Sequence, residues 1–228
     1  MLYVVGTPIG NLNDITQRAL EVLKSADVIA AEDTRHSGNL LRHFGIRKPL
    51  ISYHEHNEAM RSEELAERIA AGEIVALITD AGMPALSDPG ARLLRKCIER
   101  DLAYTIVPGP SSILTALVGS GFSLDRFYFG GFLPVKSGQR ERELRSLAER
   151  EETSVYFESP YRLTKTLTVC AAIMPERQLC VARELTKKFE EFRRGTGAEL
   201  LAHYESKPPK GEITLVISGK NAAPHSHQ

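Results

Sequence analysis

The sequence predicts an α/β protein with two α/β domains, and three observations point to this fold class. The chain has 228 residues, more than the usual size of about 100–150 residues for one domain. Hydrophobic residues make up 42% and charged residues 25%, which is typical of globular proteins. Short apolar runs alternate with Gly/Pro/Asp loops and helical patterns, as expected for βα units in a parallel sheet.

Residues 1–119 are expected to form an N-terminal domain with a parallel sheet and glycine-rich loops. Its five predicted strands are Leu2–Val5, Val28–Ala31, Leu50–Tyr53, Ile74–Thr79 and Tyr104–Val107. The clearest helical pattern begins after Asn57, which is expected to cap it. That helix is expected to end at Gly72, a residue suited to the left-handed position after a helix.

Residues 120–220 are expected to form a C-terminal domain with a mixed sheet, because Gly119 and Gly121 suggest a linker before them. Its predicted strands are Phe127–Gly130, Ser154–Phe157, Leu179–Arg183 and Ile213–Ser218. Its predicted helices are Gln139–Arg150, Arg162–Ile173 and Ala198–Tyr204. Residues 221–228 have little to bury and are predicted to be a disordered tail.

Composition excludes several classes of protein. No stretch approaches the roughly 20 apolar residues of a membrane helix, and the N-terminus lacks the features of a secretory signal, so a cytoplasmic location without membrane contact is expected. The three cysteines, Cys97, Cys170 and Cys180, lack metal-site spacing and are predicted to be buried hydrophobes. No metal site is predicted. The net charge is +0, so local clusters must hold any polyanionic partner.

Three glycine-rich loops follow predicted strands. They read GTPIGN after the first strand, DAGMPALSDPG after the fourth and PGPSS after the fifth. Loops at the carboxyl ends of parallel strands line the ligand crevice, and glycine lets the backbone approach a ligand closely. We therefore expect the three loops to share one site.

The charge of these loops limits the kind of ligand. Neither a P-loop nor a G-x-G-x-x-G dinucleotide motif is present. Residues 1–17, 73–91 and 101–125 contain no Lys or Arg, whereas Asp80 and Asp88 lie within the second loop. A polyphosphate would need counter-charges there. The site suits a neutral or cationic small molecule, and a sulfonium methyl donor fits that description.

Positive charge gathers in three other segments. The stretch from Thr34 to His54 has no acidic residue and a local charge of +4. Residues 183–194 and 136–145 are two further, modestly basic segments. Such segments are often ordinary solvated faces, but beside a cofactor cleft they would suit a phosphate-rich substrate.

Eight strings resemble a known family from Leu2 to about Ser218: GTPIGNLNDIT, AEDTRHS, YHEHNE, ITDAGMPALSDPG, VPGPSSIL, FESPYR, ARELTKKFEE and KGEITLVI. They are similar to the bacterial small-subunit ribosomal RNA (cytidine-2′-O)-methyltransferases, within the tetrapyrrole-methylase-like superfamily of class III methyltransferases. The resemblance implies two α/β domains that bind S-adenosylmethionine in the cleft between them, and a homodimer. It also implies that small-subunit ribosomal RNA, or the assembled small subunit, is the partner.

The resemblance implies donor-binding positions within the matching motifs. In the three loops these are Ile9, Gly82, Met83, Pro84, Leu86, Ser111, Ser112 and Ile113. Ala182 and Gly211 lie in strings that resemble the adenosine-contacting strands of the second domain. Ser111 and Ser112 are also a natural N-cap pair for the helix that follows.

Methyl transfer to a ribose 2′-OH requires alignment of the reactants and removal of the hydroxyl proton. Two clusters offer a proton acceptor: Asp33 with Glu32 and Arg35, and the run His54, Glu55, His56. A histidine flanked by carboxylates is a reasonable base, with His54 and His56 on one face if their strand continues. The alternative is that these residues only build the start of the helix at Asn57. Arg35, Arg162, Arg183 and Lys187 are assigned to phosphates or to the target ribose, and Glu158 and Glu184 to orienting those arginines.

Three other functions stay open. A tetrapyrrole methylase of the same fold also takes a polyanionic substrate, so charge does not separate it. A nicotinamide-dependent oxidoreductase would use Glu32 as its ribose-binding acid, but the glycine pattern fails. A non-catalytic RNA-binding module would usually display aromatic platforms, and aromatic residues are only 7% of this chain.

Overall fold

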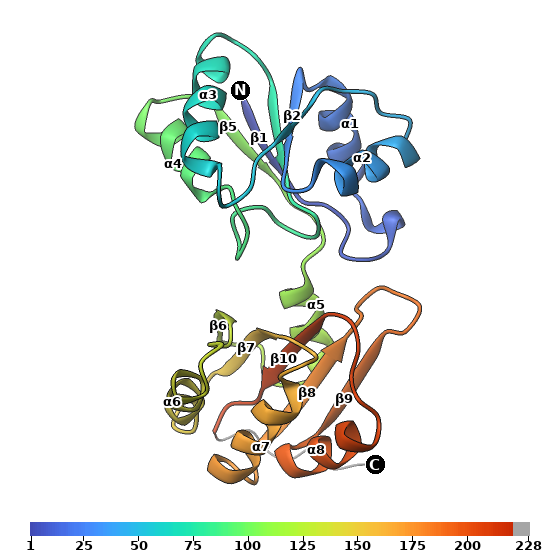
Figure 1. Cartoon of the computed structure of the whole chain (residues 1–228), viewed down its shortest axis with the longest axis vertical. Helices are drawn as coiled ribbons and strands as arrows, with labels where there is room; N and C mark the ends of the chain where they lie inside the picture. Colours follow the sequence, from blue (N-terminus) through green and yellow to red (C-terminus); the bar gives the residue numbers. More distant parts are fainter. Residues whose placement is uncertain (221–228) are drawn as a thin grey trace. The chain divides into compact units, whose positions relative to one another are not determined.

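The computed structural model describes residues 1–220, so the predicted tail lies outside the described residues. The chain divides into two compact units, Met1–Ser111 and a second that begins at Ser112 (Figure 1). Each unit has its own five-stranded sheet. The predicted α/β class with two sheets is thereby confirmed.

The first unit is a parallel sheet with the strand order β3-β2-β4-β1-β5. Its strands are β1 (Leu2–Val5), β2 (Val28–Ala31), β3 (Leu50–Ser52), β4 (Val75–Ile78) and β5 (Tyr104–Val107). All five lie within one residue or two of the predicted ranges. β2 and β4 are completely buried, which explains why they read as continuous apolar runs.

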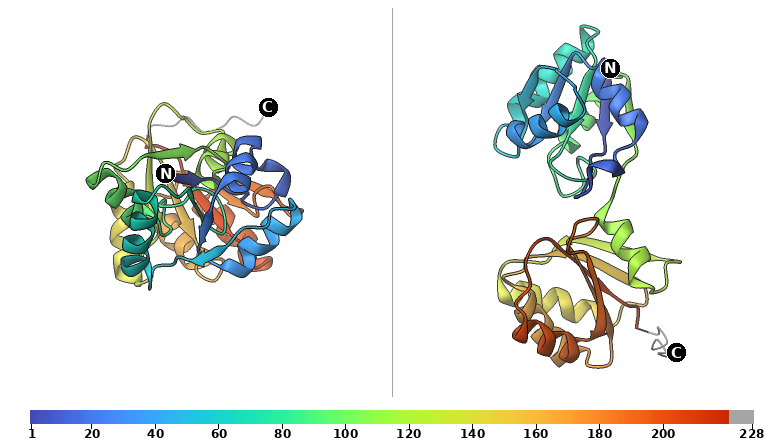
Figure 2. Two further views of the ribbon diagram at one scale, coloured as in Figure 1. Left: turned by 90° about the horizontal axis from the view of Figure 1, so that it is seen from above. Right: turned by 90° about the vertical axis from the view of Figure 1, so that its right-hand side faces the viewer.

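Helices cover both faces of this sheet (Figures 1 and 2). They are α1 (Gln17–Ser25), α2 (Thr34–His43), α3 (Glu58–Ala70) and α4 (Ala91–Glu99), with a short 3-10 turn at Leu12–Asp14. Because neighbouring strand residues point to opposite faces, Ile29 packs with α1 and α2 and Ala30 with α3 and α4. Gly72 has the predicted left-handed conformation after α3, with φ +98°.

The second unit contains a mixed sheet, as predicted, and its strand order is β6-β7-β10-β8-β9. Its strands are β6 (Phe127–Phe132), β7 (Thr153–Glu158), β8 (Gln178–Arg183), β9 (Glu191–Thr196) and β10 (Ile213–Ile217). One face is packed by α6 (Ser137–Leu147), α7 (Leu163–Ile173) and α8 (Gly197–Ser206). Helix α5 (Ser112–Ser120) contacts β7, β8, β9 and β10. All three cysteines are free and buried, as predicted.

Three details differ from expectation. The boundary between units lies after Ser111, eight residues before the predicted one, because α5 packs on the second sheet. Strand β9 was not predicted, since its sequence EFRRGT is charged. The Asn57 side chain does not cap α3; it accepts from the His54 amide (2.9 Å) and donates to the Ser52 carbonyl (3.1 Å) instead. No helix within residues 1–220 is long and apolar enough to cross a membrane.

Candidate active site

The three glycine loops of the first unit meet at one point, as predicted. Thr7 of the first loop exchanges two backbone hydrogen bonds with Gly82 of the second, at 2.9 and 3.1 Å. Gly6 lies so close to Gly109 of the third loop that a Cβ atom on Gly109 would approach the Gly6 backbone to 2.8 Å. The strand order explains this meeting, because β4, β1 and β5 are neighbours whose carboxyl ends share one edge.

Three predicted donor-binding residues of the first two loops, Ile9, Gly82 and Met83, lie at this junction. Gly82 has φ +84°, and a Cβ there would touch Ile9 and the Pro110 carbonyl at 3.5 and 3.7 Å. The sulfur of Met83 contacts Gly6. Ile9, Gly82 and Pro84 are buried, whereas Leu86 is 44% exposed. The second loop thus combines a fixed backbone with one apolar side chain open to solvent.

The other predicted donor residues are divided between the two units. Ser111 ends the first unit, and Ser112 begins α5, on which Ile113 is buried. Ala182 is buried in β8, where it pairs with Thr214 and Phe192. Gly211 has φ +81°, and the carboxylate of Glu184 fills the space that a Cβ would take. This contact already accounts for a glycine at position 211.

An acidic cluster lies beside the glycine loops, at the carboxyl ends of β2 and β4. The Thr79 hydroxyl donates to Glu32 Oε2 (2.7 Å), and the Asp33 amide donates to Asp80 Oδ1 (3.2 Å). Burial, and then the charge of Glu32, raises the pKa of Asp88 to about 6. Burial also raises the pKa of Asp80. At the level of sequence, Asp80 and Asp88 served only to limit the charge of the ligand and were not named as site residues. Two acids in a loop without Lys or Arg were the sequence feature that could have identified them.

The predicted base candidates His54, Glu55 and His56 lie in a turn. Strand β3 ends at Ser52, so the condition under which alternation would place both histidines on one strand face is not met. Asn57 holds the turn, and its Nδ2 lies 3.3 Å from His54 Nε2. The imidazole rings of His54 and His56 still lie edge to face, with 5.8 Å between their centroids. His56 and Glu55 are exposed, whereas His54 is half-buried.

Glu58 connects the histidine turn to the second glycine loop. Its Oε1 accepts hydrogen bonds from the Tyr53 hydroxyl and from the Gly90 amide, both at 3.1 Å. Gly90 ends the second loop and precedes α4. The turn therefore has a fixed position relative to the loop, although β3 and β4 are separated by β2 and thus by about 10 Å.

Asp33 and Arg35, both predicted catalytic residues, form a local pair at the start of α2. Asp33 is the N-cap of α2 and accepts from the amides of Arg35 and His36. The Arg35 guanidinium, 90% exposed, lies 3.0 Å from the Asp33 carboxylate. These hydrogen bonds lower the pKa of Asp33 to about 2, which makes it a weak proton acceptor at neutral pH.

Lys187, the predicted phosphate contact of the second unit, is held by two carboxylates. Its Nζ lies 2.9 Å from Glu184 Oε1 and 2.9 Å from Glu212 Oε2. Glu184 therefore orients a lysine rather than the expected arginine. Arg183 pairs with Glu191 of β9 (3.1 Å). In the basic segment at residues 183–194, Arg183, Lys187 and Arg193 are thus already paired with acids.

Glu158 orients Arg162, as predicted. The Glu158 side chain is completely buried and lies 2.9 Å from the Arg162 guanidinium. It also accepts from the Thr166 hydroxyl (2.6 Å) and from the Ser159 amide (2.7 Å). The pair joins the end of β7 to the start of α7.

Comparison with known proteins identifies the family. The family model of tetrapyrrole (corrin/porphyrin) methylases matches residues 1–201. Ribosomal RNA small subunit methyltransferase I of Thermotoga maritima is 47% identical over 219 residues, which cover 96% of this chain and 98% of the relative. The protein of that name from Synechocystis is 49% identical over 220 residues, 96% of this chain and 79% of the relative. The chain belongs to the ribosomal RNA small subunit methyltransferase I family.

Membership of this methyltransferase family confirms the resemblance that the eight strings indicated, and it argues against the oxidoreductase alternative. Solved structures agree on the fold. The methyltransferase CobJ has a TM-score of 0.72 at 16% identity, covering 99% of this chain and 96% of its own. Uroporphyrin-III-C-methyltransferase from Thermus thermophilus has a TM-score of 0.66 at 22% identity, covering 96% and 94%. This chain thus has the tetrapyrrole-methylase-like fold.

Proposed function

We propose that this protein transfers a methyl group from S-adenosylmethionine to the 2′-hydroxyl of a cytidine in small-subunit ribosomal RNA. The observation that carries the proposal is the junction of three glycine loops without Lys or Arg, in a chain whose relatives are named ribosomal RNA small subunit methyltransferase I. The eight motifs support the cytidine 2′-OH as the acceptor. A tetrapyrrole acceptor is the second candidate, because enzymes named for such substrates share the fold.

The residues of the junction fit the proposed donor. S-adenosylmethionine carries sulfonium and ammonium charges, and the neighbouring acids Asp80 and Asp88 suit both. Backbone groups of the Gly6, Gly82 and Gly109 loops would hold the donor. Ile9, Met83, Pro84 and Leu86 would supply apolar contacts, with Ser111, Ser112 and Ile113 at the third loop. Ala182 and Gly211 of the second unit are the proposed adenosine contacts.

Methyl transfer requires the protein to align the two reactants and to remove the hydroxyl proton. When bound, the donor supplies an electrophilic methyl carbon and leaves as a neutral thioether. The chain must aim the ribose oxygen at that carbon and accept the hydroxyl proton. We propose His54 or His56 as the acceptor, with Glu55 beside them. Asp33 is less suitable, because its hydrogen bonds with Arg35 lower its pKa and make it a weak proton acceptor. Arg35 itself, exposed at the start of α2, is proposed to contact an RNA phosphate.

Charge and exposure also bear on the partners. Within residues 1–220, the side chains of Arg47 and Lys48 form no ion pair, so the acid-free segment from Thr34 to His54 offers free cations to RNA. For Lys187 to bind a phosphate, the phosphate must replace one of the two carboxylates that now pair with the lysine.

We also propose a homodimer, because edge strand β5 exposes Tyr104 by 44% and Ile106 by 41%. A ribosomal substrate fits a cytoplasmic location.

Donor binding is the first test, and Gly109→Ala is the informative variant. The added Cβ would meet the Gly6 backbone at 2.8–2.9 Å and force two loops apart. We expect calorimetry to show S-adenosylmethionine binding by the parent without RNA, and at least about tenfold weaker binding by the variant. Gly138→Ala is the matched control, since nothing lies within 4 Å of its Cβ position. Equal affinities in all three folded proteins would contradict the site.

A further inference from the structure

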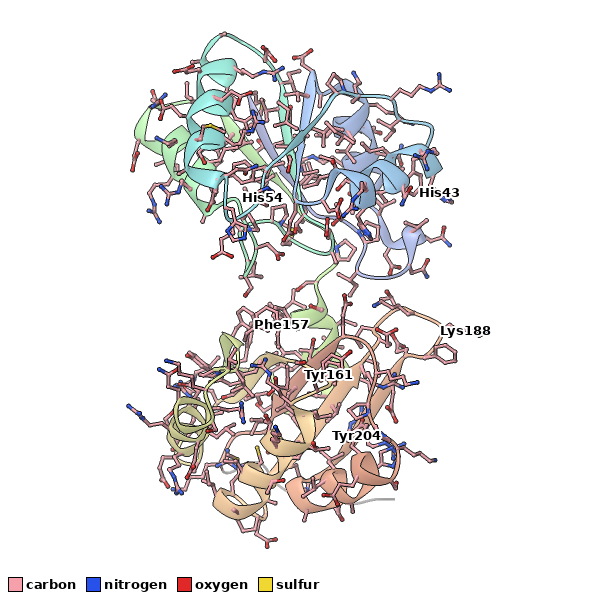
Figure 3. All side chains as sticks on the ribbon, viewed as in Figure 1. His43, His54, Phe157, Tyr161, Lys188 and Tyr204 are labelled. Carbon is pink, nitrogen blue, oxygen red and sulfur yellow. The ribbon has the colours of Figure 1, made fainter. Side chains whose placement is uncertain are left out.

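One aromatic side chain of the second unit is almost entirely outside the protein. Tyr161, in the turn between β7 and α7, is 90% exposed (Figure 3). It is the most exposed of the large hydrophobic side chains within residues 1–220. A tyrosine in this position contributes almost nothing to a core, so packing does not explain the residue.

The turn that carries Tyr161 is nevertheless rigidly built. The buried carboxylate of Glu158 accepts from the Ser159 amide, the Thr166 hydroxyl and the Arg162 guanidinium. The Ser159 hydroxyl accepts from the Tyr161 amide at 3.3 Å. Pro160 restricts the remaining backbone freedom. The backbone beneath the ring is therefore fixed, and a partner that contacts the ring has little chain entropy to overcome.

A second loop lies against this turn and is equally well anchored. Arg162 donates to the Leu133 carbonyl (3.5 Å), and the buried Arg140 donates to the carbonyls of Pro134 and Val135 at 3.3 and 3.1 Å. The loop exposes Phe132 by 61% and Val135 by 78%. Phe132 also packs on Phe157 of β7 at 5.1 Å between ring centroids.

The exposed charged side chains of the two segments that carry these residues are positive. Residues 127–140 and 159–175 contain no Asp or Glu, whereas Lys136 is exposed at the start of α6 and Lys165 lies on the first turn of α7. We call Phe132, Val135, Lys136 and Tyr161 the Tyr161 surface. Exposed rings with cations beside them and no neighbouring acids in sequence are complementary to single-stranded RNA, in which bases stack and phosphates carry the charge.

We propose that Tyr161 is a stacking platform for an unpaired base of the RNA substrate, and that Lys136 contacts the adjacent phosphate. The inference rests on the proposed function, since it assigns a recognition residue for the same substrate. Sequence-specific RNA recognition mostly targets unpaired bases that stack on aromatic side chains. The Tyr161 surface supplies this contact in a chain with few aromatic residues.

The kinetic test compares Tyr161→Leu, Tyr161→Phe and the parent, with small ribosomal subunits from cells that lack this methylation as substrate. Loss of one stacked base is expected to raise KM for the subunit about 5- to 150-fold, while the Phe variant stays within a few-fold of the parent. Affinity for S-adenosylmethionine and thermal unfolding should not change. Phe127→Leu is the matched control, because Phe127 is 45% exposed at the opposite end of β6 from Phe132.

The outcomes separate this inference from the proposed function. If the parent does not methylate the subunits, the proposed function fails. If the parent methylates them and Tyr161→Leu has the parental KM, only the stacking platform is wrong. A change of sedimentation mass in Tyr161→Leu would instead assign the Tyr161 surface to contacts between copies of the chain, and would also overturn the inference.

A spectroscopic test reads stacking directly. The chain contains no tryptophan, so Tyr161→Trp introduces a single tryptophan at the proposed platform, which can be excited apart from the tyrosines. Protein-free small-subunit RNA is expected to quench this fluorescence strongly. It should leave that of a Phe127→Trp protein nearly unchanged after correction for absorption. Equal quenching of the two proteins would contradict a specific stacking role for Tyr161.

Discussion

At the residue scale, hydrogen bonds decide which of the clustered polar side chains are available for chemistry. The sequence places Asp33, Arg35, His54 and His56 at strand ends, and the structure does so too. It also shows that Asp33 already serves as the N-cap of α2 and as the partner of Arg35. No sequence pattern reveals these two interactions. His56 is exposed, whereas His54 is half-buried, with its Nε2 3.3 Å from Asn57 Nδ2 and its Nδ1 buried.

The histidine turn leads to a prediction about catalysis. Alanine at the histidine that accepts the 2′-hydroxyl proton should lower the single-turnover methylation rate about 10²- to 10⁴-fold, with donor and RNA affinities nearly unchanged. His43→Ala is the control, because His43 lies exposed on α2 (Figure 3). If His54→Ala and His56→Ala both react at the parental rate, alignment alone supplies catalysis.

Asp88 leads to a prediction about pH. Its pKa is raised from 3.8 to about 6, so the folded state binds more protons than the unfolded state between these values. Stability therefore falls as pH rises from about 4 to about 6. Asp88→Asn should stabilise the first unit at pH 7.5 by about 1 kcal/mol, after allowance for partial solvation, and raise Tm by about 4 °C.

The comparison of two pH values gives the Asp88 prediction its control. Near pH 4 the parental carboxyl is largely protonated, so the stability difference between Asp88→Asn and the parent should nearly vanish there. Thermal unfolding followed by circular dichroism at both pH values measures it. A Tm difference of the same size at pH 4 and pH 7.5 would show that the charge of Asp88 is not its cause.

At the scale of elements, apolar periodicity locates the buried strands, and long-range pairing locates the others. β1 and β2 have the predicted bounds because their sequences are short apolar runs between turn signals. β9 has no such pattern. It exists because β8 and β9 form an antiparallel hairpin, along which Glu191 pairs with Arg193 and with Arg183 of β8. Charged residues that stabilise a strand in this way look like a solvated segment in the sequence.

The buried ion pair at the start of α7 leads to a prediction about stability. Glu158→Ala would leave Arg162, Thr166 and the Ser159 amide without their shared acceptor, so we expect a loss of about 3–5 kcal/mol in urea denaturation. Glu141→Ala, which removes an exposed partner of Arg145 on α6, should cost only about 0.3–0.5 kcal/mol. Similar losses in both variants would mean that Glu158 is no more important than a surface charge.

At the scale of the whole molecule, the sequence predicts two α/β units and predicts that the glycine loops lie together. It does not predict the strand order that brings the loops together. The order β3-β2-β4-β1-β5 places the acids of β2 and β4 between the histidine turn and the junction of the loops. Sequence gives strands in chain order only, so this neighbourhood could not be predicted from it. The boundary between the units was also missed, because the packing of α5 on the second sheet is a tertiary contact.

The central claim is that this protein methylates a cytidine 2′-oxygen in small-subunit ribosomal RNA. The most direct measurement supplies methyl-labelled S-adenosylmethionine and offers small subunits, naked RNA and a porphyrinogen separately, followed by mapping of the labelled nucleotide. The account predicts label in the RNA, on the ribose of one cytidine, and none in the porphyrinogen. Label in the porphyrinogen with unlabelled RNA, or label on a base instead of a ribose, would contradict it.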